Sequence, residues 1–199
     1  MTKIGIIILA AGASKRFGAA KQLAEFNGNT LIKKAVQTAI AVDPAEICIV
    51  LGANFEIIKK EIEDFPVKII YNPNWPEGMS SSLKTGLKYF IAKNFSAALV
   101  MLCDQPLVKS AHLNELIEKF AETGKPLIVS KYQDAEGVPA IFSGEIFSQL
   151  LKIEGDKGAR TVIEENSELA EFVEIPEAGA DIDTKKDLRK ISGSWRVDD

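Results

Sequence analysis

The chain has 199 residues, with 24 Lys and Arg against 28 Asp and Glu, and its formal net charge is −4. A chain of this length fits one globular domain that buries a full core without a metal or disulfide scaffold. The acidic balance disfavours a nucleic-acid partner, and no segment reaches the roughly 18 uncharged apolar residues of a membrane span, so we expect neither partner.

Apolar runs of strand length alternate with amphipathic stretches of helical period along the chain. This alternation predicts an α/β fold with three layers and a mostly parallel central sheet. Strands are expected at 4–9, 46–51, 67–71, 97–103, 126–130, 140–142 and 171–175. Helices are expected at 31–42, 55–64, 80–92, 111–122, 144–151, 158–166 and 185–191, the first capped by Thr30 and the second by Asn54.

Domain boundaries and location follow from the same pattern. No internal repeat and no Pro/Gly/Ser linker divides the chain, so residues 1–192 are expected to form one domain and 193–199 a surface tail or one docked by Trp195. The run at 4–9 is too short for the apolar core of a signal peptide. Cys48 and Cys103 lie in apolar runs, where free thiols pack as small hydrophobes, so we expect buried reduced cysteines and a cytoplasmic location.

The loops that follow strands are the first places to look for a site, because ligands of open α/β sheets bind at the carboxyl ends of the strands. The loop at 9–23 has small residues whose backbone N–H groups can approach an anion, and Ser14, Lys15, Arg16 and Lys21 add a hydroxyl and three cations for phosphate oxygens. The loop is neither a Walker A sequence nor Gly-x-Gly-x-x-Gly. An ordinary strand-to-helix turn with solvated cations is the alternative.

Two further loops carry hydroxyl and carboxylate groups. Gly78 and the serines at 80–82 could offer hydroxyls and free N–H groups to a base edge or a phosphate, and a serine N-cap is the alternative. Asp104 emerges where the fourth strand ends. Mg²⁺ in nucleotide sites is held by one or two carboxylates and phosphate oxygens, so Asp104 is a candidate ligand, with a turn-forming role as the alternative.

The last two candidates are a glycine-flanked turn at 154–160 and an acidic segment near the end of the chain. Asp181 and Asp183 alternate with Ile182, so on an extended backbone both carboxylates point the same way. Capping of the last helix by Asp183 or Thr184 explains the same residues equally well.

Together these segments resemble the nucleotidyltransferases related to the molybdenum-cofactor enzymes, which have a Rossmann-like, GT-A-like fold. The matching stretches are Leu-Ala-Ala-Gly-Ala-Ser-Lys-Arg-Phe-Gly at 9–18 with Lys21, Gly-Met-Ser-Ser-Ser-Leu at 78–83, Asp-Gln-Pro at 104–106, Gly-Val-Pro-Ala-Ile-Phe at 137–142, Gly-Asp-Lys-Gly-Ala-Arg at 155–160 and Asp-Ile-Asp-Thr-Lys-Lys-Asp-Leu at 181–188. The set is most similar to the cytidylyltransferase branch that serves xanthine-dehydrogenase-type enzymes. Guanylyl-transferring relatives carry Leu-Ala-Gly-Gly and Asn-Ile-Asn-Thr, so Ala11 and the Asp-Ile-Asp-Thr stretch at 181–184 favour cytidylyl transfer. Phe17 replaces the commoner Met. Ala13 is a small residue where some cytidylyltransferases have Arg, which leaves the base and phosphate contacts at that point open.

The resemblance implies a role for each matched position. Arg16, Lys21 and Asp104 would be catalytic, and Asp104 and Asp183 would hold Mg²⁺. The nucleotide would contact Leu9, Ala10, Ala11, Gly12, Ser14, Gly78, Ser80, Ser81 and Ser82, and the acceptor would contact Asp156, Lys157, Arg160 and Asp181.

The implied reaction is attack by the terminal phosphate of molybdopterin on the α-phosphorus of CTP, with transient contact to a target molybdoenzyme or its chaperone. The alternatives are guanylyl transfer to the same cofactor and nucleotidyl transfer to another phosphorylated small molecule. A non-catalytic cofactor carrier and a regulatory nucleotide sensor represent other classes.

Overall fold

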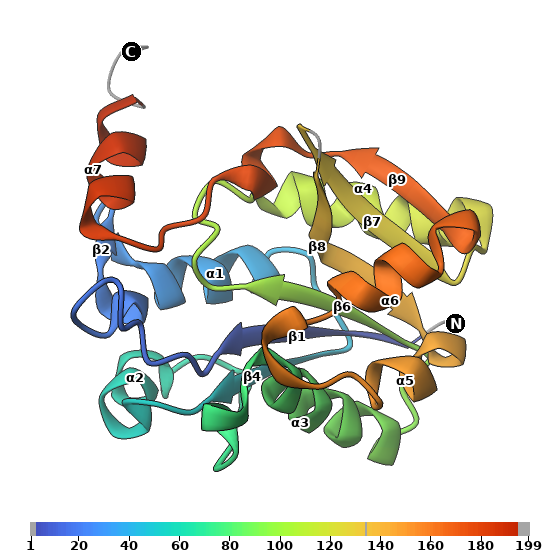
Figure 1. The fold of residues 1–199 in the computed structure, drawn as a ribbon, viewed down its shortest axis with the longest axis horizontal. Helices are drawn as coiled ribbons and strands as arrows, with labels where there is room; N and C mark the ends of the chain where they lie inside the picture. Colours follow the sequence, from blue (N-terminus) through green and yellow to red (C-terminus); the bar gives the residue numbers. More distant parts are fainter. Residues whose placement is uncertain (1–2, 134, 195–199) are drawn as a thin grey trace.

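The computed structural model describes residues 3–133 and 135–194. Within these residues, seven strands form one sheet with the order β5-β4-β1-β6-β8-β7-β9 (Figure 1). Only β8 is reversed: it pairs antiparallel with β6 and β7, and the other neighbouring strands of this sheet pair parallel. The strands are β1 (Ile4–Ala10), β4 (Glu46–Leu51), β5 (Lys68–Tyr71), β6 (Ala97–Leu102), β7 (Leu127–Tyr132), β8 (Ala135–Ser143) and β9 (Ala170–Glu174). The predicted mostly parallel sheet is confirmed.

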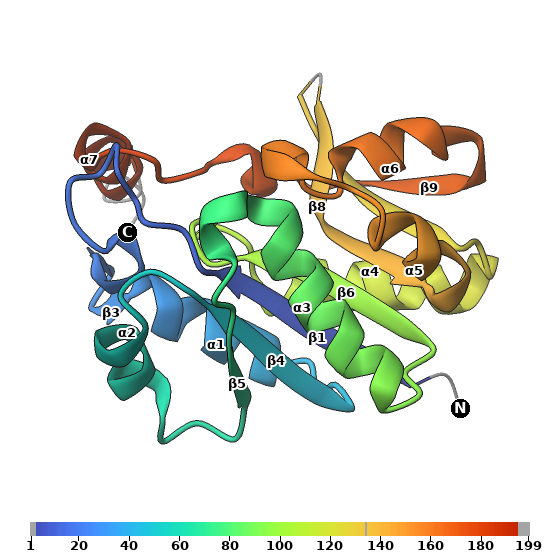
Figure 2. The same cartoon turned by 60° about the horizontal axis from the view of Figure 1, so that its bottom comes forward.

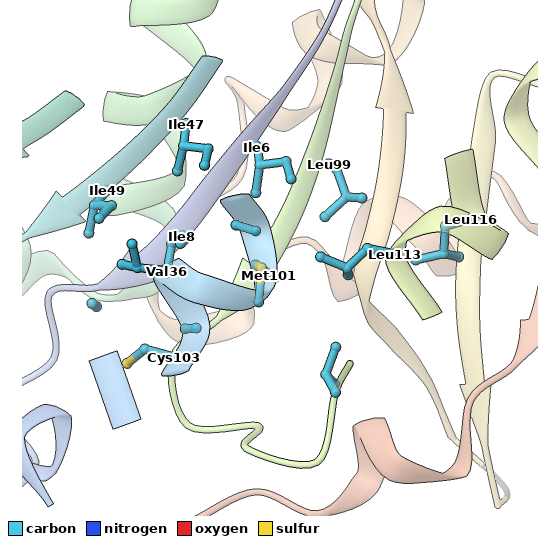
Figure 3. Packing of buried hydrophobic residues seen from close by; sticks show 14 of the residues in the cluster. Ile6, Ile8, Val36, Ile47, Ile49, Leu99, Met101, Cys103, Leu113 and Leu116 are labelled. Carbon is cyan, nitrogen blue, oxygen red and sulfur yellow. The ribbon is translucent and has the colours of Figure 1, made fainter. Parts of the chain in front are cut away.

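Helices cover both faces of the sheet, which confirms the three layers (Figures 1 and 2). One face packs against α1 (Leu31–Ile40), α2 (Phe55–Ile62) and α4 (Ser110–Thr123), and the other against α3 (Met79–Ala92), α5 (Gly144–Leu150) and α6 (Arg160–Glu165). Strand side chains alternate, so Ile6 and Ile8 of β1 join the first core and Ile7 and Leu9 the second. Figure 3 shows part of the first core, with Ile8 near Val36.

A small hairpin, β2 (Glu25–Phe26) and β3 (Asn29–Thr30), was not among the predicted strands. Asn27 and Gly28 turn the chain between them with φ of 51° and 79°. Two positive φ values at an Asn-Gly pair are the pattern of a tight hairpin turn, so the signal was present in the sequence.

Of the two predicted helix caps, one is confirmed and one is wrong. The Thr30 hydroxyl accepts a hydrogen bond from the backbone N–H of Lys33 at 3.3 Å, which confirms Thr30 as the cap of α1. The capping role predicted for Asn54 is wrong: its side chain makes no cap hydrogen bond, and its backbone is left-handed with a φ of 60°. Asn tolerates this conformation better than most residues, so it serves the turn and not the helix start.

The two thiols are buried as expected. Cys48 and Cys103 are unpaired, and burial raises the pKa of Cys48 to about 12. Helix α7 (Lys185–Ser194) extends past the predicted domain boundary at 192, and Trp195 lies outside the described residues. Among the residues that the structure describes, we find no helix with the length and apolar character of a membrane span.

Glu46 ties the start of β4 to the end of α3, and this contact predicts a pH-dependent contribution to stability. Both of its carboxylate oxygens accept from the Lys93 ammonium at 2.8 Å, and one also accepts from the Tyr89 hydroxyl. Desolvation alone would raise the pKa of Glu46, but the Lys93 and Tyr89 hydrogen bonds outweigh it and the pKa is lowered. A lowered folded-state pKa gives stability above the unfolded pKa that is lost as the pH falls.

We therefore expect Glu46→Gln to lower the free energy of unfolding at pH 7 and to make little difference near pH 3. Urea unfolding of both proteins at the two pH values measures this. Equal stability at pH 7 would contradict the prediction.

Candidate active site

The loop after β1 is pinned from inside by Gln22, which the sequence analysis did not single out. Gln22 is 1% exposed, and its amide nitrogen donates to the carbonyl oxygens of Ala10 (3.0 Å) and Gly12 (2.8 Å). Its amide oxygen accepts from the Ser14 hydroxyl at 3.3 Å. An amide both donates and accepts, so this one side chain holds several points of the loop in place.

The ammonium of Lys21 lies between two carboxylates. Lys21 begins the 3₁₀ turn η1 (Lys21–Leu23), and its Nζ is 2.5 Å from Asp104 Oδ2 and 3.0 Å from Asp183 Oδ1. The Lys21 and Asp104 side chains are only 14% and 16% exposed. Arg16 pairs with the other oxygen of Asp183 at 3.0 Å from a solvent-exposed position. The structure thus brings together all four residues that were predicted as catalytic or metal-binding.

Burial of Ile182 explains how Asp183 reaches this cluster from the far end of the chain. Ile182 is fully buried against Phe17, Phe26 and Leu31, and its N–H donates to the Asp104 carbonyl at 2.9 Å. The residue after it is thereby held beside Asp104.

Thr184, and not Asp183, caps α7. The Thr184 hydroxyl accepts from the N–H of Asp187 at 3.2 Å, and the Asp187 carboxylate accepts from the Thr184 N–H at 2.7 Å. This is the reciprocal arrangement of a capping box. The carboxylate of Asp183 remains available to Lys21 and Arg16.

Mutual electrostatics shift two pKa values in the cluster. Desolvation lowers the pKa of Lys21, but the charge of Asp104 and the hydrogen bonds to Asp104 and Asp183 outweigh it, so the pKa is raised and the ammonium stays charged. Desolvation and then the charge of Asp104 raise the pKa of Asp181 to about 6. The charge of Asp183 raises the pKa of Asp181 as well, and the role predicted for Asp181 stays a prediction.

The carboxylates fit a divalent cation that is completed by a ligand. Asp104 Oδ1 is buried and has no hydrogen-bond partner within the described residues. The described residues contain no group of three or more His, Cys, Asp and Glu placed to hold a metal. Asp104 and Asp183 could hold Mg²⁺ only together with phosphate oxygens and water, the arrangement in which one or two carboxylates suffice.

A cavity of about 410 Å³ opens above the carboxyl end of β1 and contains Lys21 and Asp104. It is large enough for a small ligand. The predicted nucleotide residues that line it are Leu9, Ala10, Ala11, Gly12, Ser14, Gly78 and Ser82. Lys15, Trp75 and Met79 line it as well. Ser80 and Ser81 do not line it.

The serines of α3 are held by Asn72, a second residue that the sequence analysis missed. The side-chain amide of Asn72, which is 1% exposed, donates to the hydroxyls of Ser81 (2.9 Å) and Ser82 (3.0 Å). Ser81 in turn donates to the carbonyl of Gly78 at 2.9 Å. Gly78, and not a serine, precedes α3, so the alternative of a serine N-cap is wrong.

Asp156 reaches the same cavity because two loops interlock through glycines. A Cβ on Gly78, whose φ is 104°, would lie 2.6 Å from Asp156 Oδ1, and a Cβ on Gly158 would lie 2.9 Å from the sulfur of Met79. The absence of a side chain at Gly78 leaves room for Asp156, and its absence at Gly158 leaves room for Met79. Predicted as an acceptor contact, Asp156 lines the cavity together with the predicted nucleotide residues.

Lys157 and Arg160 do not line this cavity. Arg160 pairs with Glu164 at 2.9 Å on the exposed face of α6. Their role toward an acceptor stays a prediction.

Comparison with known proteins places this site in a family. The MobA-like NTP transferase domain matches residues 6–170. Nicotine blue oxidoreductase of Paenarthrobacter nicotinovorans is 28% identical, over 93% of this chain and 94% of its own length. The bifunctional protein GlmU of Nitrosomonas europaea is 29% identical over 80% of this chain, which spans only 35% of GlmU. A Thermococcus sibiricus protein named "Probable molybdenum cofactor guanylyltransferase" is 24% identical over 96% of this chain and 98% of its own.

Solved structures show the same fold. The Mycobacterium tuberculosis protein Rv0371c superposes with a TM-score of 0.85 at 24% identity, covering 96% of this chain and 98% of its own. Its complex with manganese superposes with a TM-score of 0.81 at 23% identity, covering 97% and 100%. From the match over residues 6–170 and the fold that carries it, the chain belongs to the MobA-like NTP transferase family.

Proposed function

We propose that the protein transfers CMP from CTP to the terminal phosphate of a molybdopterin-type acceptor and releases pyrophosphate. The observation that carries the proposal is the cluster of Lys21, Asp104 and Asp183, of which Lys21 and Asp104 line the cavity beside the loop at 9–18. Family membership supports nucleotidyl transfer, and the relative named as a guanylyltransferase supports a molybdenum-cofactor acceptor. Ala11 and Asp181, where guanylyl-transferring relatives differ, support CTP over GTP.

The reaction needs alignment and charge neutralisation more than proton removal. An acceptor phosphate oxygen forms a bond to the α-phosphorus, the bond from that phosphorus to the bridging oxygen breaks, and pyrophosphate leaves with the electron pair. The phosphate monoester is already largely anionic near neutral pH, so no side chain has to act as a base. Lys21 and Arg16 neutralise the charge that grows on the leaving group, and backbone N–H groups of the loop at 9–18 orient the phosphates.

A divalent cation completes this arrangement. Asp104 and Asp183 would hold it, and when bound it supplies positive charge to the phosphate oxygens of the nucleotide. The manganese complex of the mycobacterial neighbour supports a metal of this class, and we propose Mg²⁺ as the working ion.

Part of the cavity lining suits a base that carries an amino group. Trp75, Gly78 and Met79 give apolar and backbone surface, and Asp156 adds a carboxylate that makes no ion pair within the described residues. A carboxylate accepts hydrogen bonds only, so it pairs with the N4 amino group of cytosine and repels the O4 carbonyl of uracil.

Asp156→Asn is expected to narrow the preference for CTP over UTP about tenfold or more, because an amide can donate to O4 where the carboxylate cannot. Equilibrium binding of CTP and UTP to both proteins measures this ratio. A ratio that does not change would remove Asp156 from base recognition.

Pyrophosphate release with Mg²⁺ tests the proposed function directly. CTP, GTP, ATP and UTP are each assayed with and without freshly prepared molybdopterin, and release is expected with CTP only when the pterin is present. Release with GTP would reassign the base, and release only with a different phosphorylated acceptor would reassign the acceptor. CTP or cofactor binding without any release would favour a sensor or a carrier.

One relative is named an oxidoreductase, so the protein should also be assayed for oxidoreductase activity. The loop at 9–23 lacks Gly-x-Gly-x-x-Gly, and strand β4 ends at Leu51, followed by Gly52, without the acidic residue that binds a dinucleotide ribose. We therefore expect no oxidation of NADH or NADPH with quinone acceptors. Turnover in that assay without pyrophosphate release would overturn the transferase proposal.

A further inference from the structure

Lys21 occupies the position between carboxylates that a bound cation would take. Its ammonium contacts Oδ2 of Asp104 at 2.5 Å and Oδ1 of Asp183 at 3.0 Å, and these two aspartates lie far apart in the sequence. The backbone beside Lys21 is fixed because its neighbour Gln22 is hydrogen-bonded to the loop after β1, and the Lys21 side chain itself is only 14% exposed. The contact is therefore part of the folded site and not a chance pairing of mobile surface charges.

The site around this ammonium has more acceptor capacity than Lys21 satisfies. Asp104 Oδ1 is buried and makes no hydrogen bond in the described part of the chain. Arg16 adds a second cation from the solvent side, on Asp183. Lys21 and Arg16 thus neutralise two carboxylates that could instead bind an ion of higher charge.

We propose that Lys21 is the built-in counter-ion of the metal carboxylates and that a divalent cation and the nucleotide displace it together. This inference rests on the proposed metal-dependent nucleotidyl transfer. The carboxylates go to the metal, and the ammonium turns to the triphosphate in the same cavity. Lys21 is thereby a positioning residue for Asp104 and Asp183 before it becomes a phosphate ligand.

Two consequences follow from this exchange. Without nucleotide, a divalent cation must compete with Lys21 for Asp104 and Asp183, so the free protein binds it weakly. With nucleotide, the ammonium gains phosphate partners, so nucleotide and metal each raise the affinity for the other by the same factor. Couplings of this kind are typically about 5- to 150-fold.

The test measures Mn²⁺ binding by the free protein, with no nucleotide, at pH 8 by electron paramagnetic resonance. Lys21→Met is expected to bind Mn²⁺ at least about tenfold more tightly than the wild type, because the competing charge is gone. The matched control is Lys15→Met: Lys15 lines the same cavity, and within the described residues it makes no ion pair. It is expected to change the affinity less than about threefold.

A second variant guards against loss of folding in Lys21→Met. Lys21→Gln keeps a hydrogen-bond donor near Asp104 without the charge, and it is also expected to gain Mn²⁺ affinity. In the wild type, a CTP analogue that cannot transfer its nucleotidyl group is expected to raise Mn²⁺ affinity at least fivefold.

Unchanged or weaker Mn²⁺ binding by both Lys21 variants would overturn the inference. The readout needs neither acceptor nor turnover. A gain in Mn²⁺ affinity in the Lys21 variants, with no pyrophosphate release from the wild type, would therefore support the counter-ion role while contradicting the proposed function. Pyrophosphate release from the wild type, with no gain in Mn²⁺ affinity in the variants, would support the proposed function and contradict the counter-ion role.

Discussion

Asp104→Asn is expected to slow pyrophosphate release at saturating CTP and acceptor by at least a hundredfold. The substitution removes the charge that faces Lys21 at 2.5 Å and weakens the buried Oδ1, the oxygen left for a metal. Losing one preorganised polar group of a reaction centre costs about 3–4 kcal/mol of barrier, and each 1.36 kcal/mol is tenfold in rate. Steady-state kinetics with saturating substrates measures the effect.

The control and the rescue make this prediction specific. Asp64→Asn removes the same charge from the exposed turn after α2 and is expected to leave the rate unchanged. High Mn²⁺ is expected to restore part of the activity of Asp104→Asn, because a weakened ligand set can be filled by mass action. A near-normal rate for Asp104→Asn would remove Asp104 from the mechanism.

Lys21→Ala is expected to cost a comparable factor in the rate constant at saturation. Lys21 neutralises the leaving pyrophosphate in the proposed reaction, so the loss should lie in kcat more than in KM. Rapid-quench measurement of one turnover separates the chemical step from product release. Lys60→Ala, on the exposed side of α2, is the matched control and is expected to keep the wild-type rate.

This variant also distinguishes two accounts of Lys21. As a general electrostatic stabiliser alone, its loss would slow turnover without a tenfold gain in metal affinity. As the counter-ion of the carboxylates, its loss is expected to slow turnover and to tighten Mn²⁺ binding in the same protein. A wild-type rate in Lys21→Ala would contradict both.

The sequence predicted the sheet well where strands are continuous apolar runs. The expected strands at 4–9 and 46–51 match β1 and β4 to within one residue, because strands covered on both faces are nearly continuous apolar runs. Strand β8 begins at Ala135, five residues before its predicted start, since Glu136 and Gly137 pair with β7 without an apolar pattern. The alternation of apolar residues does not reveal a strand segment that forms only by pairing with its neighbour.

The sequence predicted the charged residues of the site. It did not predict the residues whose role depends on packing in the folded chain. Arg16, Lys21, Asp104 and Asp183 converge as expected, because strand ends of one direction meet at one edge of the sheet. Gln22 escaped notice because its importance lies in two backbone carbonyls that only the folded loop presents.

The position of Asp156 depends on Gly78 and Gly158, which allow two loops far apart in sequence to interlock. No local pattern encodes such a contact. The predictions for individual contacts of Ser80 and Ser81 with a nucleotide remain predictions, since hydrogen bonding to Asn72 and burial occupy this part of α3.

The anchoring of Ile182 has a consequence for the order in which the protein becomes active. All strands of the seven-stranded sheet are complete by Glu174. Asp183 comes later in the chain, and its position depends on the side chain of Ile182, which packs between Phe17, Phe26 and Leu31. During synthesis the sheet can therefore form before its reaction centre exists. The charge of Lys21 then meets its second carboxylate only when the C-terminal segment seats, which makes the seating of Ile182 the last step in maturation of the site.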